Sequence, residues 1–174
     1  KYLPAIAGES LIQEIKNINA FLNNSKKPNI TIIGGAKIST KIDLLNNLID
    51  LFDTIVVGGA MANTFLFANN VNTGISLFEK DFSENALNIQ NKAKKNNCNL
   101  ILPVDVICCG SLIDKNNIVY CDVNKVNSDQ MILDVGIKTI KIINNEILKS
   151  KMLLRNGPLG AFEYKPFDQG SIEI

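Results

Sequence analysis

The 174-residue sequence contains no histidine. This absence removes the commonest general base and, with it, the usual serine and cysteine triads. Any chemistry must therefore rest on lysines, carboxylates or bound ions. Such a set of groups favours phosphoryl transfer, because that reaction depends mainly on positioning and on neutralising charge.

Two further absences concern partners and location. No apolar run approaches the roughly 20 residues that span a bilayer, and the N-terminus lacks the basic-then-apolar layout of a signal peptide. No basic block and no stripe of interleaved basic and aromatic residues occurs, and 18 Lys+Arg balance 17 Asp+Glu. We therefore expect a cytoplasmic protein whose partners include neither nucleic acid nor a membrane.

The cysteines offer no metal site. Cys98, Cys108, Cys109 and Cys121 show no C-x-x-C spacing, and no histidine is present to complete a zinc site. We expect them to pack as reduced, small apolar residues. With 46% hydrophobic and 20% charged residues, the chain has the composition and length of one globular domain with a real core.

The most informative stretch is residues 30–41, ITIIGGAKISTK, in which a β-branched run stops at two glycines and resumes as a lysine-bearing segment. The pattern predicts a strand, a tight turn and a helix that the hydroxyl of Ser39 or Thr40 caps. Lys37 and Lys41 would then share one face of the first helical turn, where the helix dipole opposes cations. The stretch is either a phosphate site or a glycine turn flanked by two solvated lysines.

Hydrophobic periodicity predicts a three-layer αβα Rossmann-like fold with a mainly parallel sheet and an appended β-hairpin. The first helix, residues 7–24, is amphipathic, and we expect it to pack on the core. The residues from 105 to 123 predict the antiparallel hairpin. We expect helices at 7–24, 42–52, 60–70, 83–97 and 138–149, and strands at 29–33, 54–57, 99–102, 105–109, 118–123, 131–135 and 151–154.

A second strand, Gly-Gly turn and helix follow the first, at residues 54–70. Because ligands bind at the carboxyl ends of parallel strands, both glycine turns should line one crevice, and the repetition favours the phosphate interpretation. The loop from Asn156 to Glu163 offers an amide and a carboxylate at the same edge, which suit a sugar or adenine contact or an ordinary turn. Asp105 either touches a ligand or metal or stabilises a turn.

Six motifs in colinear order cover nearly the whole chain and together resemble phosphoglycerate kinase. They are LPAIAG at residues 3–8, GGAKISTK at 34–41, GGAMANTF at 58–65, LPVD at 102–105, LDVG at 133–136 and NGPLGAFE at 156–163. The resemblance implies that residues 1–174 are an incomplete C-terminal nucleotide-binding domain, with residues 1–6 near the inter-domain hinge and the N-terminal substrate domain absent. It also implies a monomer.

The same resemblance implies a glycolytic phosphotransferase that takes Mg²⁺ with ATP or ADP and moves a phosphoryl group between 1,3-bisphosphoglycerate and ADP. The 3-phosphoglycerate would bind through the absent domain, so this chain would bind nucleotide without turnover. Lys37 would neutralise the phosphoryl group in flight. The residues implied to bind the nucleotide are Gly35, Ala36, Lys41, Gly58, Gly59, Leu77, Leu133, Asn156, Pro158 and Glu163.

Four positions depart from the family pattern. Ala60 and Ile132 replace glycines beside the expected adenine site, Arg155 stands where tryptophan usually precedes Asn-Gly-Pro, and Leu112 takes a place commonly held by phenylalanine. The added bulk leaves open a non-catalytic nucleotide-binding or interaction module. A dinucleotide-binding oxidoreductase domain is the other alternative, although the first glycine turn lacks G-x-G-x-x-G.

Overall fold

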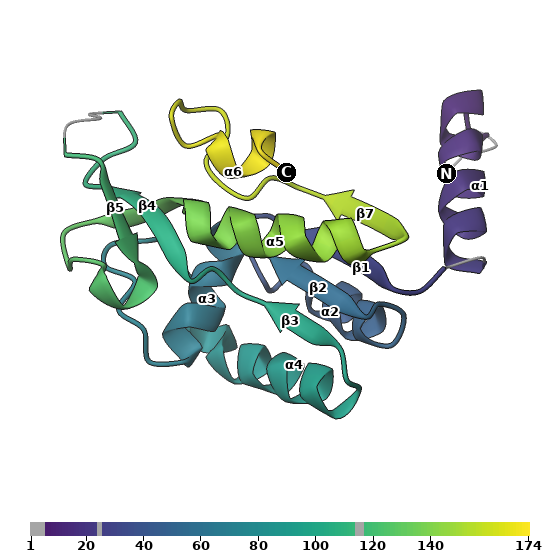
Figure 1. Cartoon of the computed structure of the whole chain (residues 1–174), viewed down its shortest axis with the longest axis horizontal. Coiled ribbons are helices and arrows are strands. Elements are labelled where there is room, and N and C mark those ends of the chain that lie inside the picture. The colour runs from purple at the N-terminus through teal and green to yellow at the C-terminus, as the bar shows by residue number, and fades with distance from the viewer. Residues whose placement is uncertain (1–5, 24–25, 114–116) are drawn as a thin grey trace, which may run out of the picture.

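The computed structural model describes residues 6–23, 26–113 and 117–174, and it contains two sheets with helices packed around them (Figure 1). The four strands β3 (Asn99–Ile101), β2 (Thr54–Val57), β1 (Asn29–Ile33) and β7 (Met152–Asn156) are parallel and adjacent in that order. The predicted α/β class with a mainly parallel sheet is confirmed. The expected hinge, residues 1–6, lies outside the described residues except for Ile6.

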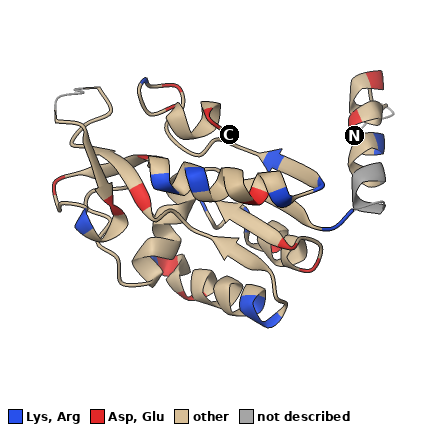
Figure 2. Ribbon diagram, in the orientation of Figure 1, with Lys and Arg blue, Asp and Glu red and all other residues tan. Residues whose placement is uncertain are grey.

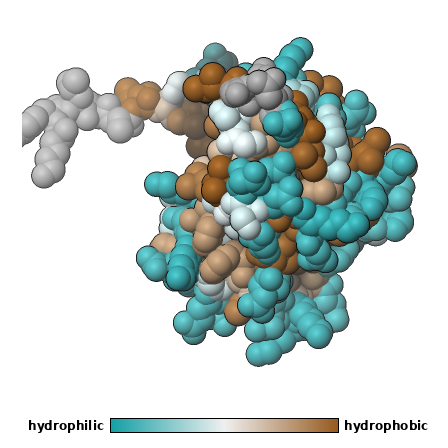
Figure 3. All heavy atoms as spheres, turned by 90° about the vertical axis from the view of Figure 1, so that its left-hand side faces the viewer, coloured by the Kyte–Doolittle hydropathy of each residue, from teal (hydrophilic) through white to brown (hydrophobic). Residues whose placement is uncertain are grey.

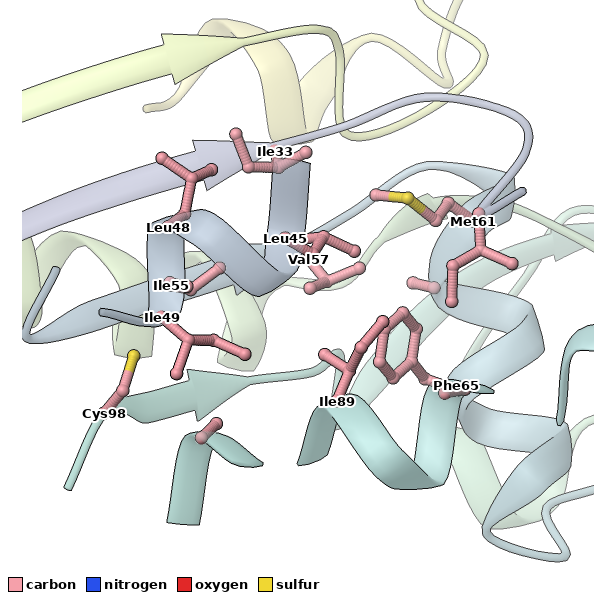
Figure 4. Packing of buried hydrophobic residues seen from close by; sticks show 14 of the residues in the cluster. Ile33, Leu45, Leu48, Ile49, Ile55, Val57, Met61, Phe65, Ile89 and Cys98 are labelled. Carbon is pink, nitrogen blue, oxygen red and sulfur yellow. The ribbon is translucent and has the colours of Figure 1, made fainter. Parts of the chain in front are cut away.

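Helices cover both faces of the parallel sheet, which explains why β1 and β2 are apolar almost throughout. On one face, Ile33, Ile55 and Val57 pack against α2 (Ile42–Ile49), α3 (Ala60–Ala68) and α4 (Ser83–Lys95) (Figure 4). On the other face, the side chains that pack against α5 (Ile137–Lys149) are Ile30, Ile32 and Val56. The edge strand β3 is less covered than β1 and β2, since only Ile101 of its three residues is buried.

The second sheet is antiparallel and has the order β5-β4-β6, formed by β5 (Val119–Asp122), β4 (Asp105–Cys109) and β6 (Met131–Val135). The predicted hairpin of β4 and β5 is therefore confirmed, but it pairs with β6 rather than with the parallel sheet. Three short helices complete the described elements: the 3₁₀ helices η1 (Lys80–Phe82) and η2 (Val123–Lys125), and α6 (Gln169–Ile172).

The cysteines pack as expected. All four are free thiols, and Cys98, Cys108 and Cys109 are buried. Burial raises the pKa of Cys98 to about 11, and burial together with the neighbouring Cys121 raises the pKa of Cys108 to about 12. Both thiols are therefore protonated at neutral pH and act as small apolar groups.

The first helix forms where the sequence predicts it, but its predicted packing is wrong. Helix α1 (Glu9–Asn23) stands apart from the two sheets at one end of the molecule (Figure 1). Its apolar side chains Leu11, Ile12, Ile15 and Ile18 are 42–48% exposed. The buried clusters on the parallel sheet are closed by α2 to α5 instead, so the amphipathic pattern of α1 finds no partner among the described residues.

The predicted cap of the second helix is also wrong. Helix α2 begins at Ile42, its N-cap is Lys41, and no side chain caps it. The Thr40 hydroxyl donates to the Lys37 carbonyl at 3.0 Å, and the Ser39 hydroxyl is bound by Glu79. Lys37 therefore lies in the turn before the helix rather than in its first turn.

Asp105, the first residue of β4 in the second sheet, stabilises the N-terminus of helix α5. Its carboxylate accepts hydrogen bonds from the backbone N–H of Lys138 at 2.9 Å and of Thr139 at 2.7 Å, and from the Thr139 hydroxyl at 2.7 Å. Because it is buried and joins β4 to the N-terminus of α5, its observed contacts follow the turn-stabilising alternative of the sequence interpretation.

We predict that Asp105→Ala lowers the free energy of unfolding by about 2 to 4 kcal/mol, because three donors at the start of α5 lose their acceptor. Urea denaturation followed by circular dichroism measures the change. The control is Asp122→Ala, which removes an exposed carboxylate paired with Lys138 of the same helix and should barely move the midpoint. Equal midpoints for the two variants would contradict this role of Asp105.

Candidate functional site

Three loops meet at the carboxyl edge of the parallel sheet, following the adjacent strands β7, β1 and β2. Backbone hydrogen bonds join them. The Gly34 N–H donates to the Asn156 carbonyl at 2.8 Å, and the Gly59 N–H donates to the Leu159 carbonyl at 2.9 Å. The two predicted Gly-Gly turns and the 156–163 loop therefore share one edge, as the strand order requires.

The loops approach so closely that side chains are excluded at their contact points. Gly59 has a φ of 69°, and a Cβ atom there would lie 2.5 Å from the Gly35 carbonyl oxygen. A Cβ atom on Gly34 would overlap the Pro158 carbonyl oxygen. Glycine is needed at both positions because only it tolerates this backbone geometry or this approach.

A cavity of about 400 Å³ opens between these loops, α3 and the antiparallel sheet. Its volume suits a ligand of nucleoside size. Most of its wall is apolar, and the polar side chains in it belong to Asn63, Asp134, Glu163 and Tyr164. The predicted site residues that line it are Gly35, Ala36, Gly59, Leu77, Leu133, Pro158 and Glu163.

The antiparallel sheet presents Leu133 to the cavity through an irregularity in its pairing. Asp134 pairs with Ile107 and Ile132 pairs with Cys108, so Leu133 has no residue opposite it. Such a bulge redirects the side chains of a strand. Its presence is consistent with the finding that the consecutive residues Ile132 and Leu133 both line the cavity.

The remaining predicted residues lie beside the cavity rather than in its wall. Lys41 donates through Nζ to the Gly34 carbonyl at 2.9 Å and to Asn156 Oδ1 at 2.6 Å, so it bridges the ends of β1 and β7. Burial lowers the pKa of Lys41. Gly58 lies beneath the loops, where a Cβ atom would overlap the Leu159 side chain.

Lys37 is exposed, and neither it nor Lys41 forms an ion pair within the described part of the chain. Figure 2 shows lysines, arginines and acidic residues spread over the helices and loops. The two lysines are thus distinguished by their position and not by a generally positive surface. Together they place positive charge next to the glycine turn, where an anionic group of a ligand would be stabilised.

Glu79 holds the lysine-bearing turn, a role that the sequence did not reveal. Its carboxylate accepts hydrogen bonds from the Ser39 N–H at 2.9 Å and from the Ser39 hydroxyl at 2.6 Å. Burial alone would raise the pKa of Glu79, but these bonds and one from the Ile38 backbone lower it below its usual value. Because Glu79 is 40 residues from Ser39 in the sequence, no local sequence pattern predicts the contact.

Asp134 is a second residue that the sequence interpretation passed over. It is 2% exposed, and it accepts hydrogen bonds from the Val135 N–H at 2.8 Å and the Gly170 N–H at 2.9 Å. Burial, with a smaller contribution from nearby Asp168, raises its pKa to about 6, although the backbone N–H groups oppose the shift. Asp134 therefore ties β6 to α6, which follows the loop carrying Glu163.

Groups of three or more metal-ligating side chains are absent from the described residues. Those residues also include no helix long and apolar enough to cross a membrane. Figure 3 views the molecule from the end that carries β4 and β5, where hydrophobic residues lie among hydrophilic ones.

Comparisons with known proteins point to one family. A family model described as phosphoglycerate kinase matches residues 1–174. The chain is 44% identical over 172 residues to phosphoglycerate kinase of Caulobacter vibrioides and 45% identical over 174 residues to that of Methylorubrum extorquens. These matches include 99% and 100% of this chain but only 43% and 44% of the two relatives. The chain therefore spans less than half of their length.

Solved structures of phosphoglycerate kinases also resemble this chain. Phosphoglycerate kinase from Coxiella burnetii superposes with a TM-score of 0.91 at 38% identity, over 96% of this chain and 43% of that one. The enzyme from Pyrococcus horikoshii superposes with a TM-score of 0.81 over 98% of this chain and 44% of that one. At 24% identity, the second match shows the fold alone.

We predict that titration of Asp134 makes the chain less stable as the pH rises. Between its ordinary pKa of 3.8 and its folded pKa of about 6, the folded chain keeps a proton that the unfolded chain has released. The free energy of unfolding should therefore fall across this interval, by on the order of 2 kcal/mol, relative to a non-titrating Asp134→Asn variant. Urea denaturation of both proteins from pH 4 to 7 measures the difference, and parallel pH profiles would refute it.

Proposed function

Since the chain belongs to the phosphoglycerate kinase family, we propose that it supplies the nucleotide side of reversible phosphoryl transfer between 1,3-bisphosphoglycerate and ADP, which gives 3-phosphoglycerate and ATP. Residues 1–174 would form an incomplete nucleotide-binding domain, because the chain spans less than half of its relatives. The carbon substrate would bind to a domain outside this chain, so the chain alone would bind nucleotide without turnover. We further propose a monomer that acts in the cytoplasm.

One observation carries the proposal: an apolar cavity of nucleoside size lies next to two lysines that have no ion-pair partner among the described residues. An apolar wall suits a base, and ammonium groups suit the phosphates that follow it. The carboxylate of Glu163 in the same cavity suits the ribose hydroxyls, which can donate to it.

Each site residue has a role that follows from its position. In the proposal, Leu77 and Leu133 flank the base, while Lys41 and Asn156, already hydrogen-bonded to each other, face the nucleotide phosphates. Exposed Lys37 neutralises the phosphoryl group during transfer, and no covalent enzyme intermediate forms. The backbone of Gly35, Ala36, Gly58, Gly59 and Pro158 shapes the cavity.

Magnesium would enter as part of the Mg-nucleotide substrate. The described residues provide no cluster of metal ligands, so the nucleotide phosphates would supply the coordinating oxygens on this side. The lysines and the metal would then share the neutralisation of the phosphate charge.

A non-catalytic nucleotide-binding module is the second candidate, and one observation favours it. Ala60 and Ile132, the two bulkier substitutions, both line the cavity and reduce the space next to the proposed base. The oxidoreductase alternative has no such support, because the family match is to a kinase.

We predict that the folded chain binds Mg-ADP and that Lys41→Ala weakens this binding by about tenfold or more, since a charge-assisted contact to phosphate is lost. Isothermal titration calorimetry measures the dissociation constant. Lys94→Ala, at an exposed position in the last turn of α4, is the matched control and should bind like the parent chain. The proposal would be refuted if the folded chain does not bind Mg-ADP, or if it binds NAD more tightly than Mg-ADP.

A further inference from the structure

Glu79 lies in the loop that follows α3, and two consecutive residues of that helix hold this loop. The Glu79 N–H donates to Thr64 Oγ1 at 3.0 Å, and the Leu77 carbonyl accepts a hydrogen bond from Asn63 Nδ2 at 3.1 Å. Both helix residues are buried. Because hydrogen bonds that are shielded from water are electrostatically stronger than exposed ones, the backbone of Glu79 is fixed relative to α3.

The side chain of Glu79 reaches from this loop to the turn that carries Lys37. Its carboxylate accepts hydrogen bonds from the Ser39 N–H at 2.9 Å, from the Ser39 hydroxyl at 2.6 Å and from the Ile38 backbone. Ile38 and Ser39 are the two residues that directly follow Lys37. Glu79 therefore binds the backbone next to the point from which the exposed Lys37 side chain extends.

The charges of Glu79 and Lys37 act on each other without an ion pair. Burial would raise the pKa of Glu79, whereas the hydrogen bonds from the turn and the nearby charge of Lys37 lower it. No ion pair joins the two side chains in the described part of the chain, so the Lys37 ammonium group stays open to a ligand. Glu79 has two opposite effects on a phosphate that binds there: its charge repels the phosphate, and its hold on the turn fixes the place of Lys37.

We propose that Glu79 is a positioning residue that fixes the turn so that Lys37 meets the terminal phosphate of bound Mg-ATP. This inference rests on the proposed function, in which Lys37 neutralises the transferred phosphoryl group and Lys41 faces the phosphates that remain on ADP. The hold on the turn should therefore matter more for Mg-ATP than for Mg-ADP. The ratio of the two affinities separates this role from a general distortion, which would weaken both nucleotides equally.

The test is calorimetric titration of the folded chain with Mg-ATP and with Mg-ADP. In Glu79→Ala, we expect the ratio of the Mg-ATP to the Mg-ADP association constant to fall about three- to tenfold, the range of one net hydrogen bond. Glu79→Gln should lose less, because its amide can accept from the Ser39 N–H and donate to the Ser39 oxygen. In Lys37→Ala, adding Glu79→Ala should leave the ratio within about twofold, because the effect acts through Lys37.

Glu84→Ala is the matched control, because it removes an exposed acid from the first turn of α4 and should keep the parent ratio. Ser39→Ala, which removes one of the hydrogen bonds, repeats the test if Glu79→Ala does not fold. This inference alone is overturned by an unchanged ratio in the folded variant, by a ratio that rises in both Glu79 variants because only the charge acts, or by the same fall in the absence of Lys37. If the parent chain binds neither nucleotide, the proposed function is overturned instead.

Discussion

The site depends on one constraint, the close approach of three loop backbones at the ends of β7, β1 and β2. Gly59 donates to the Leu159 carbonyl, and its missing Cβ leaves room for the Gly35 carbonyl. Gly34 makes the corresponding contact with the 157–158 backbone. Because the loops are joined by backbone bonds between adjacent parallel strands, the sheet fixes the cavity wall, and no flexible side chain has to do so.

The charges at this edge are arranged around the same backbone. Lys41 is held between the Gly34 carbonyl and Asn156, and Glu79 holds the turn that presents Lys37. The charge of Lys37 helps to lower the pKa of Glu79, but neither Lys37 nor Lys41 forms an ion pair in the described chain. An apolar cavity and an unpaired cationic edge thus lie side by side, which is the division that a nucleotide requires.

Local sequence pattern predicted what depends on neighbouring residues and failed where distant contacts decide. A continuous β-branched run predicted β1 at residues 29–33, and two β-like runs separated by turn residues predicted the hairpin of β4 and β5. Local patterns assigned the wrong N-cap to α2, because Glu79 binds the Ser39 hydroxyl that was expected to cap the helix. They also could not show that the apolar face of α1 stays exposed, since that depends on which surface is available to cover it.

The same distinction between local pattern and distant contacts applies to the candidate site. Motif resemblance found the glycine turns, both lysines and Glu163, because these residues are contiguous in sequence. It passed over Glu79 and Asp134, whose significance comes from hydrogen-bond partners that only the folded chain reveals. A lone glutamate in a loop and a lone aspartate in a strand carry no sequence signal of this kind.

A crystal structure of the chain with Mg-ADP bound tests the proposed nucleotide site most directly. The base should occupy the cavity between Leu77 and Leu133, Glu163 should contact the ribose, and the diphosphate should lie against Lys41 and the first glycine turn. Nucleotide bound elsewhere, for example in the groove lined by Phe67 and Phe78, or a diphosphate turned away from Lys41, would contradict it.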